Sequence, residues 1–150
     1  MKTILSVLED FFQNDDWHYV HLENTTILNT AFQGQNGRYE CFAQARELQH
    51  QCVFYSVSPL KVPPEKRQEV MEFITRANYG MVVGNFEMDL SDGEVRYKTS
   101  LDVEDVEFTP VMVRNLVYPN LLIMDRYFPG IMRVVYGGLT AEEAIQEVER

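Results

Sequence analysis

Histidines, cysteines and acidic runs are the residues of this 150-residue chain whose types and spacing could support chemistry. His18 and His21 are three residues apart, and on a β-strand that spacing places the two imidazoles on opposite faces, so they cannot chelate one ion together. Cys41 and Cys52 lie outside any CxxC motif and away from a helix start, where the pKa of a thiol would fall. We therefore expect two free cysteines packed in the core and no zinc site.

Two acidic segments suggest hard cations. Asp89–Glu94 resembles part of a calcium loop, but it lacks the alternation and the closing glutamate of an EF-hand. In the second segment, residues 102–107, strand alternation would place Asp102 and Glu104 on one side of the chain, although a solvated acidic loop is the simpler interpretation. A small-ligand- or metal-responsive regulator or enzyme that uses the acidic loop 102–107 is the alternative function that these residues leave open.

Glycines at positions 80 and 84 lie near the start of a predicted strand, but the segment lacks both GxGxxG and the strand-to-helix order of a phosphate site. No nucleophile, base or metal cage stands out, so we predict a protein that is not an enzyme and needs no cofactor. The net charge of −10 opposes binding to nucleic acid or anionic lipid. No run approaches the roughly 20 apolar residues of a membrane span, and we expect a cytoplasmic protein.

Hydrophobic periodicity predicts an α+β domain that spans residues 1–150. Five to six strands would form an antiparallel sheet from an N-terminal meander and a hairpin over 85–100, with the helices packed mainly on one face. The predicted helices cover 4–12, 65–79, 111–136 and 141–148, and the third is expected to be kinked or divided at Pro119 and Pro129. Residues 52–57 are apolar on both sides, which indicates a strand interior to the sheet.

Two predicted turns set the strand registers. Asn36-Gly37 as a two-residue turn pairs Phe32 with Cys41 and Leu28 with Ala45; the opposite face of that hairpin is mostly polar, with Ala31 and Phe42 as an apolar spot. Asp92-Gly93 as a two-residue turn pairs Leu90 with Val95, Met88 with Tyr97, Asp89 with Arg96 and Glu87 with Lys98.

Several blocks of sequence carry a resemblance to a known family. They are Val53–Pro59, Val62-Pro63, Arg76–Gly80, Gly84–Glu87, Asp92–Lys98 and Met124–Tyr127. Together they resemble the YbjN-domain family, in particular its cyanobacterial branch, over the stretch from about Val53 to Gly138.

That resemblance implies an α+β fold similar to the type III secretion chaperones, a class whose members are small, acidic and commonly dimeric. YbjN-like proteins are described as regulators of sensory transduction or of stress and motility, with no established enzymatic reaction and no catalytic residues. The favoured function is therefore a non-enzymatic protein-binding module, a chaperone-like protein or regulatory adaptor, that binds a protein or peptide and could form a homodimer. Fold alone does not fix that function.

Methionine and aromatic side chains make the C-terminal helical region adaptable enough to bind a partner, although packing in the core explains the same residues. The candidate partner-binding residues are Met112, Tyr118, Met124, Tyr127, Met132 and Tyr136. An exposed strand edge is the other place where a partner could add. Asp125 and Arg126 lie in the same region, and we interpret them as the edge of the helix, with the Arg126 stem along apolar surface.

Overall fold

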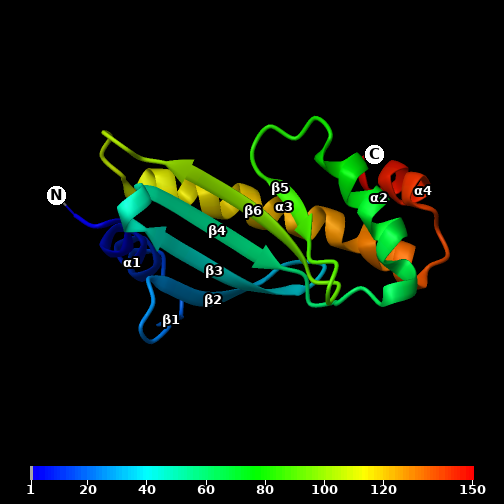
Figure 1. Cartoon of the computed structure of the whole chain (residues 1–150), viewed down its shortest axis with the longest axis horizontal. Helices are drawn as coiled ribbons and strands as arrows, with labels where there is room; N and C mark the ends of the chain where they lie inside the picture. The colour runs from blue at the N-terminus through cyan, green and yellow to red at the C-terminus, as the bar shows by residue number, and fades with distance from the viewer. Residues whose placement is uncertain (1) are drawn as a thin grey trace.

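The protein is described by a computed structural model that covers residues 2–150. Six strands form one antiparallel sheet in the order β1-β2-β3-β4-β6-β5 (Figure 1). The strands are β1 (Tyr19–His21), β2 (Ile27–Gln33), β3 (Arg38–Arg46), β4 (Gln51–Val57), β5 (Asn85–Met88) and β6 (Val95–Asp102). The helices are α1 (Ile4–Asn14), α2 (Arg67–Asn78), α3 (Pro110–Tyr136) and α4 (Ala141–Val148). The predicted α+β architecture is confirmed, and β4 is interior to the sheet as expected.

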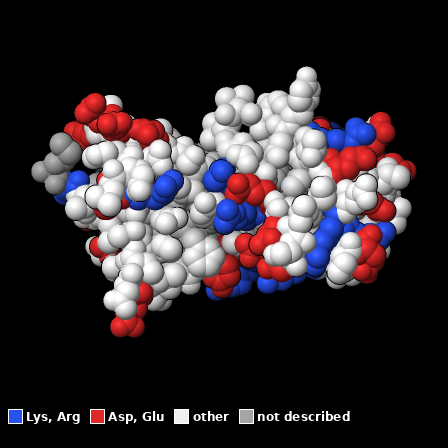
Figure 2. All heavy atoms as spheres, viewed as in Figure 1, with Lys and Arg blue, Asp and Glu red and all other residues white. Residues whose placement is uncertain are grey.

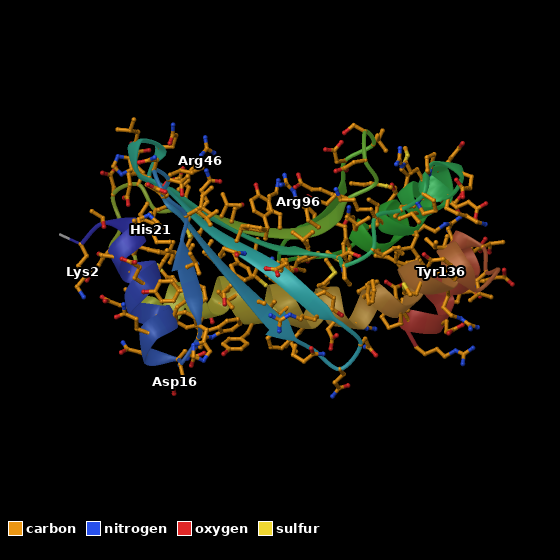
Figure 3. All side chains as sticks on the ribbon, turned by 90° about the horizontal axis from the view of Figure 1, so that it is seen from below. Lys2, Asp16, His21, Arg46, Arg96 and Tyr136 are labelled. Atoms are coloured by element: carbon orange, nitrogen blue, oxygen red, sulfur yellow. The ribbon has the colours of Figure 1, made fainter. Side chains whose placement is uncertain are left out.

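The helices are distributed unevenly around the sheet. In Figures 1 and 3, α3 lies along one face with α1 beside it, while α2 and α4 pack against the C-terminal half of α3 at one end. No helix formed by residues 2–150 lies over the opposite face (Figure 3). The sheet therefore has one covered face, which holds the core, and one open face.

Three helices, α1, α3 and α4, begin where side chains accept hydrogen bonds from their first amides. At α1, Thr3 accepts a hydrogen bond from the Ser6 amide, and the Glu47 carboxylate accepts from the amides of Ile4 and Leu5, both at 3.0 Å. At α4, Thr140 and Glu143 form the reciprocal capping box that the sequence shows. The α1 cap depends on a residue more than 40 positions away, so it also ties this helix to the start of β4.

α3 is one uninterrupted helix of 27 residues. Of the two expected alternatives, a kinked or a divided helix, the divided one is wrong. A proline removes one helical hydrogen bond and crowds the preceding turn. Beside Pro119 the helix is anchored on the sheet, because the Thr99 hydroxyl donates to the Leu116 carbonyl at 2.8 Å and the neighbouring Asn120 side chain forms hydrogen bonds with groups on β4 and β6. Contacts with the sheet thus hold the helix through the proline.

The first hairpin has a longer loop than predicted. Gly34 donates its amide to the Gly37 carbonyl at 2.8 Å, which closes a four-residue loop, and the register becomes Leu28 with Ala43 and Phe32 with Tyr39. The predicted pairs are therefore displaced by two residues. A displacement by two keeps every side chain on its predicted face, because side chains alternate along a strand.

The second hairpin shows the same displacement. Met88 pairs with Val95 and Glu87 with Arg96, and residues 89–94 form the loop. The Asp89 carboxylate accepts hydrogen bonds from the amide and hydroxyl of Ser91, which shapes that loop. Gly93 has φ of +82°, and a Cβ there would lie 2.1 Å from the Val62 carbonyl oxygen, so only glycine fits.

Candidate functional site

The open face of the sheet carries an apolar strip that no helix covers. Alternate residues of a strand point to the same face, so the register of β2, β3 and β4 brings these side chains together. We call them the open-face strip: Ile27, Ala31, Phe42, Val53, Tyr55 and Val57. Val53 is buried among its neighbours and the other five are half-buried. Figure 2 looks onto this face and shows a broad uncharged area between clusters of charged side chains.

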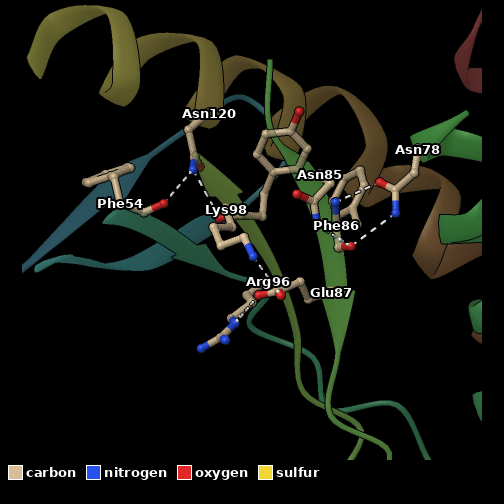
Figure 4. A network of polar contacts seen from close by, with 9 residues as sticks. Phe54, Asn78, Asn85, Phe86, Glu87, Arg96, Lys98 and Asn120 are labelled. Atoms are coloured by element: carbon tan, nitrogen blue, oxygen red, sulfur yellow. Dashed lines mark hydrogen bonds and ion pairs between the residues drawn. The ribbon is translucent and has the colours of Figure 1, made fainter. Parts of the chain in front are cut away.

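A charged cluster borders the open-face strip on β5 and β6 (Figure 4). The Glu87 carboxylate accepts from Arg96 at 2.9 Å and from Lys98 at 3.1 Å, and the Arg96 guanidinium lies 4.0 Å from the centre of the Tyr55 ring. Partial burial would raise the pKa of Glu87, but the hydrogen bonds and charges of Lys98 and Arg96 outweigh it and lower that pKa below its usual value. The border is therefore a fixed set of charges beside an apolar centre.

The strip is also hollowed. A depression of about 380 Å³ has Phe42, Tyr55 and Val57 among its lining residues, with Arg96 and Glu94 at its side. An apolar centre with a polar rim is the usual anatomy of a protein interface. The open face can therefore receive side chains from a partner.

The covered face holds its polar groups in a different way. Asn120 is fully buried; it accepts from the Ser56 hydroxyl at 2.5 Å and donates to the carbonyls of Phe54 at 3.1 Å and Tyr97 at 3.0 Å (Figure 4). Within residues 2–150, every buried side-chain nitrogen and oxygen has a hydrogen-bond partner. These groups are hydrogen-bonded within the fold, and they position α3 on the sheet.

The predicted partner-binding residues on α3 are divided between core and surface. Met124 is fully buried and Tyr127 is 4% exposed, with its hydroxyl donating to Glu149 at 2.6 Å. Burial of both residues removes them from the surface of the isolated chain, as the core interpretation of this region expects. Tyr136 is exposed, whereas Met112, Tyr118 and Met132 are half-buried. A role for these four in partner binding stays a prediction.

The residues considered for chemistry are not brought together. Among residues 2–150, no three His, Cys, Asp or Glu side chains are placed to hold a metal ion. In the loop 102–107, Asp102 accepts from the Glu104 amide at 3.0 Å, and Glu104, Asp105 and Glu107 are exposed. Cys41 and Cys52 are free and buried as predicted, and burial raises the pKa of each thiol to about 12.

Sequence reasoning missed two features. Asp125 is not simply a helix edge: its carboxylate accepts from the amides of Gln35 and Asn36, both at 2.9 Å, and from the Tyr39 hydroxyl at 2.6 Å. Partial burial opposes ionisation, but these hydrogen bonds, first that of Tyr39, lower the pKa of Asp125. The open-face strip was also missed, although the signal was present in the apolar spot on β2–β3 and in the two apolar sides of β4.

Comparisons with known proteins agree with this fold. The chain resembles the crystal structure of “YbjN, a putative transcription regulator from E. coli” with a TM-score of 0.60 at 13% identity, covering 79% of this chain and 86% of that one. It also resembles the “HopA1-SchA Chaperone-Effector Complex” with a TM-score of 0.52 at 11% identity, covering 82% of this chain and 90% of that one. These likenesses show the fold that this chain shares with the two structures. None of the curated proteins matches the sequence.

Two further findings concern the whole chain. None of the helices formed by residues 2–150 has the length and apolarity needed to cross a membrane. The model of the YbjN family, described as “Putative bacterial sensory transduction regulator”, matches residues 5–145. That match spans nearly the whole sequence and extends the resemblance seen in the sequence blocks to the N-terminal helix and meander. The chain belongs to the YbjN family.

Proposed function

We propose that this protein is a non-enzymatic protein-binding module, a chaperone-like protein or regulatory adaptor, that holds a segment of a partner protein against the open-face strip. The observation that carries the proposal is the strip itself: apolar side chains from three adjacent strands, uncovered by any helix of residues 2–150. Apolar surface that a folded chain leaves uncovered commonly marks an interaction site, and here Asn29, Glu40 and Gln44 of the same face border the apolar side chains.

The border of the strip supports a protein partner. Glu87, Arg96 and Lys98 present both signs of charge beside Tyr55 and Val57, so a partner can meet an apolar centre and a polar rim at once. The structural likeness to a chaperone–effector complex and the family description as a regulator are consistent with a protein partner. A cytoplasmic location and a homodimer are parts of the same proposal.

Affinity capture from the source cell tests the proposal when three forms of the protein are compared. The first is the unchanged chain. The second carries Phe42→Thr and Val57→Thr, which remove apolar surface from the strip while keeping strand-compatible residues. The third carries Leu122→Gln and Tyr136→Gln, which remove exposed apolar surface from α3, where both residues are more than 60% exposed.

The proposal expects partners that the unchanged chain and the α3 variant retain and the strip variant loses. Partners lost only from the α3 variant would instead support the C-terminal helix as the contact surface. Capture profiles that are identical for all three forms would refute a binding role for the strip. Thermal unfolding of each variant, measured in parallel, separates loss of binding from loss of folding.

A further inference from the structure

A second hollow lies at the end of the sheet where α1 begins, away from the open-face strip. It has a volume of about 730 Å³, within the size range of ligand sites. Its floor is apolar and nearly buried, formed by Ile4, Val103 and Phe108. Its rim is the loop after β6, seen at the left end of Figure 1, where Val106 is 52% exposed. We call it the end hollow.

Some charged side chains at the end hollow are unpaired, and others already form hydrogen bonds or ion pairs. Among residues 2–150, Asp105 and Glu107 form no hydrogen bond or ion pair through their carboxylates, although both line the hollow. The lining Glu47 and Lys2 are already engaged: Glu47 caps the first amides of α1, and the Lys2 ammonium binds Asp10 at 2.7 Å. The imidazole of His50 also lines the hollow and is counted as neutral at pH 7. Figure 2 shows the resulting acidic cluster at this end of the molecule. The unpaired charge around the apolar floor is therefore negative.

We propose that the end hollow binds a basic segment of a partner protein, with one large apolar side chain on the floor and flanking lysine or arginine side chains beside Asp105 and Glu107. Complementary charge at the rim selects the partner and speeds its approach, while the apolar floor supplies contact area. An acidic segment with the same apolar residues would be repelled. The proposal uses none of the residues of the open-face strip, so it does not depend on the function proposed above.

Fluorescence anisotropy with a labelled, amidated Lys-Leu-Lys-Phe-Lys peptide tests this proposal, and Glu-Leu-Glu-Phe-Glu is the matched probe. Two variants change the rim: Asp105→Asn with Glu107→Gln removes both of its negative charges, and Val106→Lys replaces an exposed apolar side chain between them with a positive one. Asparagine suits position 105, whose φ is +61°. The matched controls are Asp16→Asn with Glu23→Gln, where residue 16 has φ of +59°, and Leu90→Lys, where the side chain is 55% exposed.

The proposal expects saturable binding of the basic peptide and none of the acidic one. Each rim variant should weaken binding about fivefold or more, while both controls leave the Kd within about twofold. Absence of saturable binding at submillimolar peptide would overturn the proposal. So would equal affinity in the rim variants and their controls, or loss of peptide binding in the strip variant Phe42→Thr/Val57→Thr alone, which would assign the peptide to the open face.

Discussion

The two faces of the sheet differ in the environment of their polar groups: those of the covered face are buried, and those of the open face contact water. We expect the first set to contribute to stability and the second to recognition. On the covered face, Asn120 is buried and neutral, and all its hydrogen bonds are made to the fold. On the open face, Glu87, Arg96 and Lys98 pair in contact with water. Loss of a partner costs much more in a buried network than in an exposed ion pair. We therefore expect covered-face changes to unfold the protein and open-face changes to alter what it binds.

Asn120→Leu should have the largest effect on stability. Leucine keeps the branched shape and the number of side-chain heavy atoms, but it leaves the Ser56 hydroxyl and the carbonyls of Phe54 and Tyr97 without their buried partner. We expect the free energy of unfolding to fall by about 3 kcal/mol or more, measured by urea denaturation. Asn115→Leu, an exposed position on the same helix, is the control and should change little. A loss below about 1 kcal/mol for Asn120→Leu would contradict the contrast between the faces.

Asp125→Asn should have the next largest effect, because Asp125 joins α3 to the first hairpin loop. Hydrogen bonds to a charged group contribute about 1.5–3 kcal/mol, and the amide keeps only part of the acceptor capacity, so we expect a loss of roughly 2 kcal/mol. The pKa of Asp125 is lowered in the folded state. Its contribution is therefore present above the unfolded-state pKa and is lost as pH falls through the lower folded-state pKa.

The dependence of stability on pH in the acid range tests whether the stabilisation by Asp125 is lost as pH falls. Denaturation midpoints measured from neutral to strongly acidic pH should fall less steeply for Asp125→Asn than for the unchanged chain. The exposed acid Asp105, replaced by Asn, serves as the control and should leave the slope as it is. An Asp125→Asn curve parallel to that of the unchanged chain would show that the carboxylate charge does not stabilise the loop.

Asp125 also explains why the sequence predicted the faces of the first hairpin but not its register. Asn36-Gly37 favours a two-residue turn locally. In the structure the Asp125 carboxylate, 89 positions from Asn36, accepts hydrogen bonds from the loop amides and so favours the longer loop. A Cβ on Gly34 would lie 2.4 Å from this carboxylate. Local turn preference cannot include that distant acceptor, whereas the alternation of apolar residues needs no such information.

α3 and the open-face strip show the same limit for the candidate site. Pro119 predicts a break in the helix because the sequence does not show the hydrogen bonds between α3 and the sheet at that point. Thr99 donates to the Leu116 carbonyl, and Asn120 donates to the Tyr97 carbonyl. Apolar residues on both sides of β4 predict an interior strand, which is correct. The same pattern does not predict that one of those sides lacks a covering helix. Periodicity identifies apolar faces, and only the packing of the helices decides which of them remain open.

Glu87→Gln should have a smaller effect than either covered-face change. It removes the charge that Arg96 and Lys98 share, and exposed pairs contribute at most about 1 kcal/mol each. We expect a loss of about 1 kcal/mol at low ionic strength that shrinks when salt is added, measured by urea denaturation at two salt concentrations. A loss that is independent of salt would show that the cluster is effectively buried and that the contrast between the faces is overstated.

Phe42→Thr with Val57→Thr should have the smallest effect on stability and the largest on recognition. Both side chains are half-buried on the open face, both replacements suit a strand, and surface substitutions usually change stability by about 0.5 kcal/mol or less. We expect the urea midpoint to stay close to that of the unchanged chain while partner capture is lost. If the double variant were as unstable as Asn120→Leu, the strip would belong to the core, and its apolar character would need no partner to explain it. Stability near that of the unchanged chain would mean that folding does not require these side chains to be apolar, which leaves binding as the reason for their chemistry.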